Sequence, residues 1–269
     1  MIDSDQPKYG AWPYILPFMA FMLVSMFEPR FPDQNEDGLP PEILQQAQEN
    51  PDSPALSEAD TYALTERRQL ANQFFLTYGF KVLLTTGLLI FFWRIYSKQF
   101  PFSTSWLSVV VGAVGIVVWV GLCHLGIESA LIGWFQVEDI SMRSHFNPFA
   151  QIPEDWQLYL FLAIRFFGLV IMVPICEELL LRGLLMRYIE SPDWWTISLG
   201  RLSFRTMLVA PMYGLATHPT EALAAVAWFS LVTWLVHRTG KFWDAVIAHA
   251  ITNLLLGLYV CVFSQWQLW

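Results

Sequence analysis

Charged side chains are scarce in this sequence: Asp, Glu, Lys and Arg make up 14% of its 269 residues, against about 25% in an average soluble domain. Apolar residues make up 55% of the chain, and they include 21 Phe and 13 Trp. So little charge cannot cover the surface of one soluble domain. The composition therefore predicts a protein that crosses a membrane several times.

Cysteine is also rare, and basic clusters are missing. Cys123, Cys176 and Cys261 lie in apolar runs and none belongs to a CxxC pair, which excludes a disulfide framework and a zinc–thiolate site. We expect each to be a small buried residue. Without a basic patch, the sequence gives no sign of a nucleic-acid partner. The net charge of −8 comes mostly from residues 28–72, which carry ten acidic and three basic residues.

Apolar runs predict about seven membrane helices, so the expected fold class is an all-α, polytopic transmembrane helical bundle with a long acidic exoplasmic loop. The runs are residues 10–27, 74–96, 106–125, 157–188, 204–217, 219–236 and 242–263. The fifth run is short and Pro219 follows it, which predicts a helix that stops inside the membrane. In the third run, Gly112, Gly115 and Gly121 predict close helix packing. Lys81 in the second run is expected to snorkel toward the membrane surface.

Basic residues set the predicted orientation. Eight of the 15 Lys and Arg residues fall on one side of a seven-helix arrangement and four on the other, and the richer side is normally cytoplasmic. We therefore expect an integral, multi-pass protein of a bacterial plasma membrane with its N-terminus in the cytoplasm. The acidic, proline-rich segment 28–72 is expected to be an extended loop outside the cell, and residues 127–155 a loop on the membrane surface.

Glu177, Glu178 and Arg182 form a cluster of charged residues within the fourth apolar run, and Arg165 is a further charge three turns upstream. Each charge costs about 2.5–3.5 kcal/mol at the bilayer centre on insertion scales, so such residues are retained where they are paired and used. Glu178 and Arg182 are four residues apart and can form an ion pair on one helix face. Glu177 lies about 100° further round the helix and can act as a general base toward water. Pro174 is expected to kink the helix one turn before it.

Polar residues of two later helices complete the set. His218 ends the fifth run, and His249 and Asn253 share one face of the seventh. Glu177 and His249 lie about 18 Å and 12 Å from the cytoplasmic ends of their helices, which suits one pocket. Taken singly, the histidine and asparagine could be a helix-packing hydrogen-bond pair, and the glutamate and arginine a structural ion pair. Together these residues indicate a polar cavity within the membrane.

The same residues carry a resemblance to a known family. Glu177-Glu178-x-x-x-Arg182, a histidine at the end of the next helix, and His249-x-x-x-Asn253 resemble the motifs of the CAAX-processing protease and bacteriocin-immunity (CPBP) family. This is a family of intramembrane proteases, and its eukaryotic relatives are the type II CAAX prenyl endopeptidases.

The resemblance covers about residues 158–257, and residues 233–253 are particularly similar to the family. One position departs from the pattern. The family usually has an aromatic residue four before its histidine, where this sequence has Gly214. The aromatic residue here is Tyr213, five before His218.

The resemblance implies a protease with four catalytic residues. Glu177, helped by His218, would activate a water that attacks the scissile carbonyl. His249 and Asn253 would stabilise the oxyanion, a task that suits fixed donors in a dry site.

The resemblance also bears on supporting residues and on metals. Glu178 and Arg182 would support the catalytic residues without touching the substrate. A glutamic-type mechanism without metal or cofactor is preferred, because the sequence has no HExxH and its two histidines lie on different helices. In a zinc enzyme the ligands would be Glu177, His218 and His249.

The chain thus divides into three predicted parts: residues 1–72, an N-terminal anchor with the acidic loop; 73–156, two accessory helices and the surface loop; and 157–269, the catalytic core. We expect an intramembrane endopeptidase whose partners are membrane lipid and a membrane-attached or transmembrane peptide substrate. The alternatives are a non-catalytic immunity or assembly protein on the same scaffold, and a proton-coupled transporter that uses the same Glu and His as a relay.

Overall fold

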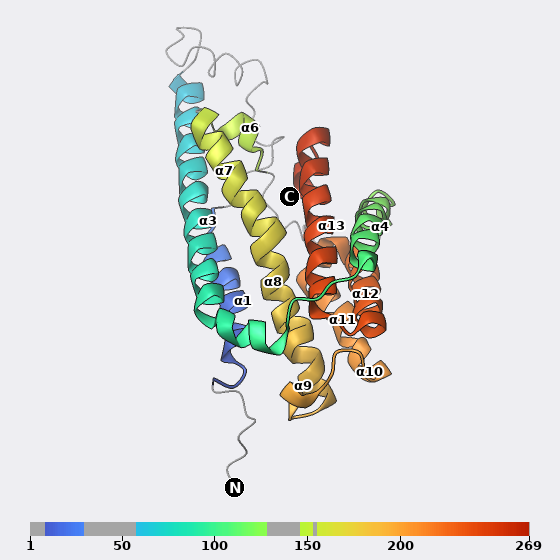
Figure 1. The fold of residues 1–269 in the computed structure, drawn as a ribbon. Helices are drawn as coiled ribbons and strands as arrows, with labels where there is room; N and C mark the ends of the chain where they lie inside the picture. The colour runs from blue at the N-terminus through green and yellow to red at the C-terminus, as the bar shows by residue number, and fades with distance from the viewer. Residues whose placement is uncertain (1–8, 30–57, 128–145, 153–154, 269) are drawn as a thin grey trace.

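The computed structural model describes residues 9–29, 58–127, 146–152 and 155–268 (Figure 1). Every regular element within these ranges is helical, which confirms the predicted all-α fold class. Most of the predicted acidic loop, and most of the predicted surface loop at 127–155, lies outside the described residues.

The described helices, in chain order, have the following bounds. The α-helices are α1 (Trp12–Ser25), α3 (Glu58–Gln99), α4 (Trp106–Cys123), α6 (Pro148–Gln151), α7 (Asp155–Phe167), α8 (Val173–Glu178), α9 (Met186–Glu190), α10 (Phe204–Met207), α11 (Val209–Thr217), α12 (Ala222–Thr239) and α13 (Phe242–Phe263). Gly168–Met172 and Leu179–Leu185 are π-helical, and Trp194–Thr196, Pro219–Glu221 and Trp266–Leu268 are short 3-10 turns.

Within the described residues, five helical stretches are long and apolar enough to cross a membrane, judged by length and composition. They are Arg68–Gln99, Trp106–His124, Asp155–Glu190, Pro219–Thr239 and Phe242–Phe263. The first predicted run forms α1, which has 14 residues. The fifth forms α10 and α11, of which the longer has nine. The polytopic architecture is confirmed, and seven complete spans remain a prediction.

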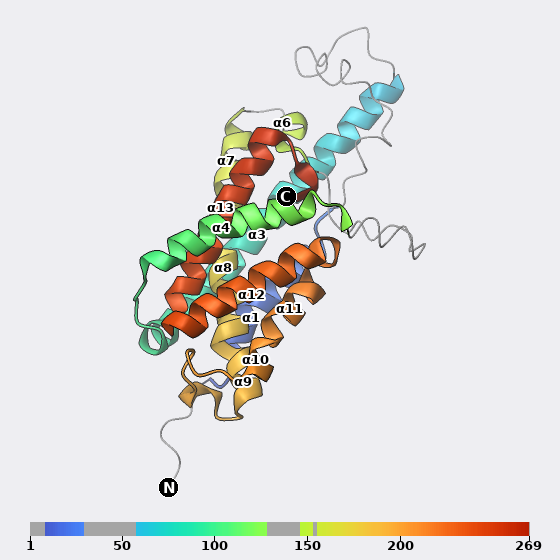
Figure 2. The same ribbon diagram turned by 90° about the vertical axis from the view of Figure 1, so that its right-hand side faces the viewer.

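One long helical run passes through the middle of the bundle. It comprises α7, α8, α9 and the two π-helical segments (Figure 1). On one side α1 packs along α3 and also contacts α8 and the second π-helical segment. On the other side α4, α12 and α13 pack together, with α11 against α12 (Figure 2). The central run therefore connects two groups of helices.

Two glycines allow α4 to approach α13 closely. A Cβ atom at Gly112 would lie 2.7 Å from the Cβ of Ile251, and one at Gly115 would lie 2.6 Å from Thr252 Oγ1. Both distances are too short for a side chain, which confirms the predicted close packing. The prediction is wrong for Gly121, where a Cβ atom would meet no other atom within 4 Å.

Lys81 does not snorkel. Its side chain is 3% exposed, and its Nζ lies 2.5 Å from Glu28 Oε1 and donates to Ser25 Oγ at 3.1 Å. A charged side chain within the membrane can be stabilised by an oppositely charged partner instead of by reaching the membrane surface. The sequence prediction is wrong because it considered only the helix that carries Lys81, whereas its partners come from the end of α1 and just beyond.

Candidate active site

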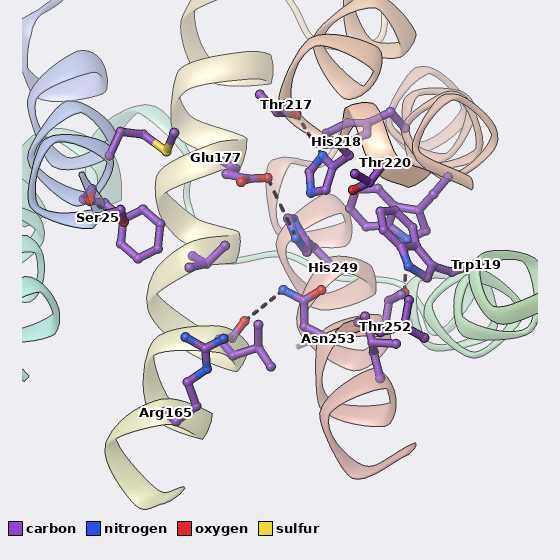
Figure 3. A pocket seen from close by; sticks show the side chains of 18 of the residues that line it. Ser25, Trp119, Arg165, Glu177, Thr217, His218, Thr220, His249, Thr252 and Asn253 are labelled. Atoms are coloured by element: carbon purple, nitrogen blue, oxygen red, sulfur yellow. Dashed lines mark hydrogen bonds and ion pairs between the residues drawn. The ribbon is translucent and has the colours of Figure 1, made fainter. Parts of the chain in front are cut away.

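The four predicted catalytic side chains line one cavity of about 410 Å³. Glu177 reaches it from the C-terminal end of α8, His218 from the end of α11, and His249 and Asn253 from α13 (Figure 3). The structure thus brings together residues from three helices that are up to 76 positions apart in sequence. This is the convergence that a shared catalytic role requires.

Glu177 and Glu178 lie on an unusual stretch of helix. α8 has only six residues and is flanked by π-helical segments on both sides. π-Helical turns are rare and occur frequently at functional sites. Consecutive residues on α8 point about 100° apart. Glu177 therefore turns to the cavity while Glu178 turns into the protein, as predicted.

The first π-helical segment supplies a hydrogen-bond acceptor to Asn253. The N–H of Val173 bonds to Gly168 O, five residues back. In the same register the donor to Leu169 O would come from Pro174, which has no N–H. Asn253 Nδ2 instead donates to Leu169 O at 2.9 Å. The proline predicted to kink this helix therefore leaves a carbonyl that fixes the orientation of the Asn253 amide.

The predicted ion pair between Glu178 and Arg182 is present and fully buried. Arg182 Nη1 lies 2.7 Å and 2.6 Å from the two carboxylate oxygens, and both side chains are 0% exposed. Arg182 Nη2 also donates to Phe229 O at 3.2 Å and to Thr233 Oγ1 at 3.3 Å. The pair therefore anchors the central helical run to α12 through charge-assisted hydrogen bonds.

His249 lies between the two glutamates. Its Nδ1 is 3.1 Å from Glu178 Oε1, and its Nε2 is 4.0 Å from Glu177 Oε2 (Figure 3). A carboxylate paired with arginine only accepts hydrogen bonds, so the Nδ1 of His249 carries a proton. The second distance is too long for a direct hydrogen bond and leaves room for a bridging water.

His218 reaches the site because α11 ends early. The residue has φ −132° and ψ 63°, outside the helical region, and the 3-10 turn beginning at Pro219 follows it. Its ring packs edge-on against Trp119, with centroids 5.4 Å apart, and its Nδ1 lies 2.9 Å from Thr217 Oγ1. The prediction that this helix stops short, with its histidine at the cavity, agrees with the structure.

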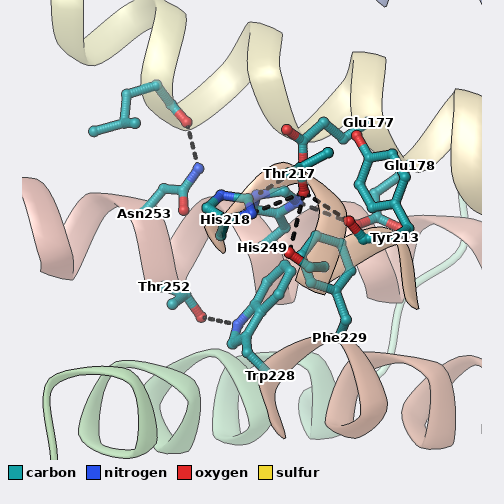
Figure 4. Close-up of polar contacts among 12 residues, drawn as sticks. Glu177, Glu178, Tyr213, Thr217, His218, Trp228, Phe229, His249, Thr252 and Asn253 are labelled. Carbon is teal, nitrogen blue, oxygen red and sulfur yellow. Dashed lines mark hydrogen bonds and ion pairs between the residues drawn. The ribbon is translucent and has the colours of Figure 1, made fainter. Parts of the chain in front are cut away.

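The displaced aromatic residue near His218 has a steric cause. A Cβ atom at Gly214 would lie 2.6 Å from Phe229 Cδ2 and 3.2 Å from Ala225 O, so α11 and α12 are too close for a side chain there. The aromatic ring comes instead from Tyr213, which packs against Phe229 with centroids 5.3 Å apart (Figure 4).

Two further residues of the site carry no recognisable sequence signal. Trp228 packs against His249 with ring centroids 4.5 Å apart, and its Nε1 donates to Thr252 Oγ1 at 3.1 Å (Figure 4). Thr252 also contacts the carbonyl of Gly112 at 2.9 Å. This chain of contacts positions His249 against α4 and α12. Only the three-dimensional packing of α4, α12 and α13 identifies it.

Helices that precede the predicted catalytic core form part of the cavity wall. α1 contributes Phe21, Met22 and Ser25, α3 contributes Tyr78, and α4 contributes Trp119. The sequence carried no motif in these helices, so their contribution was not predicted. The cavity is therefore shaped by residues from both groups of helices.

The zinc alternative and the preferred metal-free mechanism both stay predictions. Within the described ranges, no three His, Cys, Asp or Glu side chains are grouped so that they could hold one metal ion. Glu177, His218 and His249 line the same cavity without forming such a group. Among the cysteines, Cys176 is buried as predicted, whereas Cys123 and Cys261 are only partly buried.

Comparison with known proteins finds one family model that is similar to part of this chain. Residues 158–255 match the family model described as type II CAAX prenyl endopeptidase Rce1-like. The match runs from α7 into α13 and includes all six residues singled out above from the sequence motifs. No curated protein and no solved structure matches the chain. The core of the chain, residues 158–255, is therefore similar to the Rce1-like type II CAAX prenyl endopeptidase family, in agreement with the resemblance of its motifs.

Proposed function

We propose that this protein is an intramembrane endopeptidase that hydrolyses a peptide bond of a membrane-attached or transmembrane substrate. The similarity of residues 158–255 to the Rce1-like endopeptidase family supports protease activity. The observation that carries the proposal is the convergence of Glu177, His218, His249 and Asn253 on one cavity. Polar groups within membrane-spanning helices are costly, and a cluster of them that lines a cavity is expected to act on a ligand.

Glu177 is proposed as the general base. Its side chain is 14% exposed, in contrast to the fully buried Glu178. A water oxygen near Glu177 Oε2 attacks the scissile carbonyl carbon while one water proton moves to the carboxylate. His218 lies on the same cavity and accepts a hydrogen bond from that water. General-base assistance of this kind contributes about 10²–10⁴-fold.

His249 and Asn253 are proposed to stabilise the oxyanion. The Nδ1–H of His249 donates its hydrogen bond to the Glu178 carboxylate. The ring can therefore donate a second hydrogen bond from Nε2 only when both ring nitrogens carry protons. The carboxylate of Glu178, itself held by Arg182, stabilises that positive charge. Asn253 uses one amide N–H for Leu169 O and retains a second for the substrate oxygen.

The reaction then returns the enzyme to its starting state. The tetrahedral intermediate collapses, the carbon–nitrogen bond breaks, and the proton held by Glu177 moves to the departing amine. No metal or cofactor takes part in any step of this proposal.

Substitution of the base tests the proposal. Glu177→Gln keeps the size of the side chain but cannot accept the water proton, so we expect kcat to fall by at least about 100-fold while the protein accumulates normally. His249→Ala should have a similar effect through the oxyanion. The matched control is Asp155→Asn, an exposed acidic residue at the start of the same helical run, which should cleave like the wild type. Peptide cleavage is measured on purified protein in lipid nanodiscs, and full turnover by Glu177→Gln would refute the assignment.

The same variants separate the alternatives. A non-catalytic immunity or assembly protein would keep its cellular effect in Glu177→Gln. A proton-coupled transporter would show substrate flux in sealed vesicles that this variant abolishes, without any cleavage product.

A further inference from the structure

A second cavity lies at the corner of the bundle where α3 and α12 end and α13 begins (Figure 2). Its volume is about 260 Å³, and the connection that follows α9 forms another part of its wall. It shares no lining residue with the cavity of the candidate active site. A ligand bound here would therefore be separate from the proposed peptide substrate.

The charge that lines this cavity is positive. Arg187 and Lys241 are on its wall, and no Asp or Glu of the described residues is. The helix α13, 22 residues long, begins at Phe242 on the same wall, and the first N–H groups of a helix carry a partial positive charge. Asp244 in that first turn is 0% exposed, and its carboxylate accepts hydrogen bonds from Thr104 and Ser105. The cavity is therefore suited to an anion.

Arg187 brings a buried charge to this site. The residue is 3% exposed, and its guanidinium donates to three carbonyl oxygens: Ile197 O at 2.9 Å, Gly183 O at 3.1 Å and Trp195 O at 2.8 Å. These acceptors are neutral, and among the described residues no carboxylate forms an ion pair with Arg187. A buried charge without a counter-charge is costly. An anion in the adjoining cavity would compensate it.

Lys241 offers a direct ligand for such an anion. Its Nζ donates to Thr104 O at 3.2 Å, and an ammonium group has three protons to donate. Ser103 and Ser198 are exposed residues that line the same cavity and carry hydroxyl groups. An ammonium group and hydroxyls beside a helix N-terminus are well suited to the oxygens of a phosphate group.

The place of the cavity favours a phosphate that belongs to a lipid. The stretches Arg68–Gln99, Pro219–Thr239 and Phe242–Phe263 all begin or end at its wall or next to it, which is the level of the lipid headgroups if these helices cross the membrane. Trp93 and Trp106, near the same helix ends, are 44% and 75% exposed, and exposed tryptophan is typical of the membrane surface. Basic pockets between helices at this level bind anionic headgroups.

We propose that this cavity binds the phosphate group of an anionic phospholipid. Lys241 is the direct cationic ligand, and the same phosphate compensates the buried charge of Arg187. The bound lipid would join the ends of α3, α12 and α13, which the cavity separates. This inference is independent of the proposed protease activity, so its test does not use cleavage.

Native mass spectrometry measures the binding directly. Purified protein in detergent is titrated with phosphatidylglycerol and, in a second series, with phosphatidylcholine, whose phosphate is balanced by its own cation. We expect the wild type to bind one phosphatidylglycerol more tightly than phosphatidylcholine. Lys241→Gln should weaken that binding by at least about tenfold, because a charge-assisted contact is lost. Lys241 is the residue to change, because removal of Arg187 would also leave three carbonyls without their donor.

Further variants separate this site from general surface charge. Ser198→Asp places a negative charge on the cavity wall and should also abolish the preference for phosphatidylglycerol. The matched control is Arg238→Gln, which removes an exposed charge on α12 outside the cavity and should bind like the wild type. Equal losses in Lys241→Gln and Arg238→Gln, or no lipid preference in the wild type, overturn the proposal. A Lys241-dependent rise in melting temperature with inorganic phosphate, without any lipid preference, would overturn the lipid assignment in favour of free phosphate.

Discussion

The buried pair of Glu178 and Arg182 allows folding and catalysis to be separated by mutation. Arg182→Met removes the guanidinium and leaves the Glu178 carboxylate without its cation, in a place where neither side chain is exposed. Breaking one partner of a buried ion pair costs about 3–5 kcal/mol. In a protein of this size that corresponds to a melting temperature lower by on the order of 10 °C.

The double variant Glu178→Met/Arg182→Met should recover most of that loss. It leaves no uncompensated charge, and replacing a buried pair by apolar residues of similar volume is often neutral. The other contacts of Arg182 are not orphaned, because Thr233 Oγ1 donates to Phe229 O at 2.7 Å on its own. Activity should not recover, because His249 loses the carboxylate that holds its Nδ1. We expect kcat to stay at least about 100-fold below the wild type.

Two assays on the same preparations check both parts. Melting is followed by tryptophan fluorescence in detergent, and peptide cleavage is measured in nanodiscs. Arg238→Met, which changes an exposed arginine on α12, is the matched control and should alter neither. A double variant as unstable as Arg182→Met would contradict the charge argument. A double variant that cleaves at the wild-type rate would contradict the role assigned to Glu178.

Two further predictions concern α13. Asn253→Leu should lower kcat by about 10²–10³-fold, because it removes an oxyanion donor together with the hydrogen bond to Leu169 O; cleavage at the wild-type rate would refute that role. Gly112→Ala should destabilise the protein by about 1–3 kcal/mol, because the added methyl group would lie 2.7 Å from Ile251 Cβ. Gly121→Ala on the same helix has open space and should leave the melting temperature unchanged; equal effects of the two substitutions would refute the packing argument.

The local features of the site were predictable because they depend on neighbours along one helix. Glu178 and Arg182 pair because four residues bring them onto one helix face. α13 has the predicted bounds, Phe242–Phe263, because Gly240 adopts φ 66° before it and the apolar run ends at Phe263. His249 and Asn253 line the same cavity because they too are four residues apart and so lie on one face of α13.

The features that sequence reasoning missed depend on contacts between helices. The partner of Lys81 is Glu28, in a segment that the sequence describes only as polar. The packing of Trp228 on His249 depends on how α12 crosses α13. Residue type alone does not determine whether the helix around α8 has α-helical or π-helical hydrogen bonds. Pro174 restricts these hydrogen bonds because it has no N–H to donate. Glycine is needed at position 214 because α12 approaches α11 closely there, and no sequence pattern within α11 indicates this close approach.

The walls of the cavity have a consequence for how such an enzyme can diversify or be redesigned. Every residue proposed to handle the water, the proton or the oxyanion comes from residues 158–255, whereas Phe21, Ser25, Tyr78 and Trp119 come from earlier helices. Part of the cavity wall is thus encoded outside the stretch that carries the proposed chemistry. Exchanging side chains of α1 and α3 would reshape the space offered to a peptide while leaving the bond-breaking groups in register. If the proposed protease activity is established, a library confined to those two helices would test how far its choice of substrate can be changed.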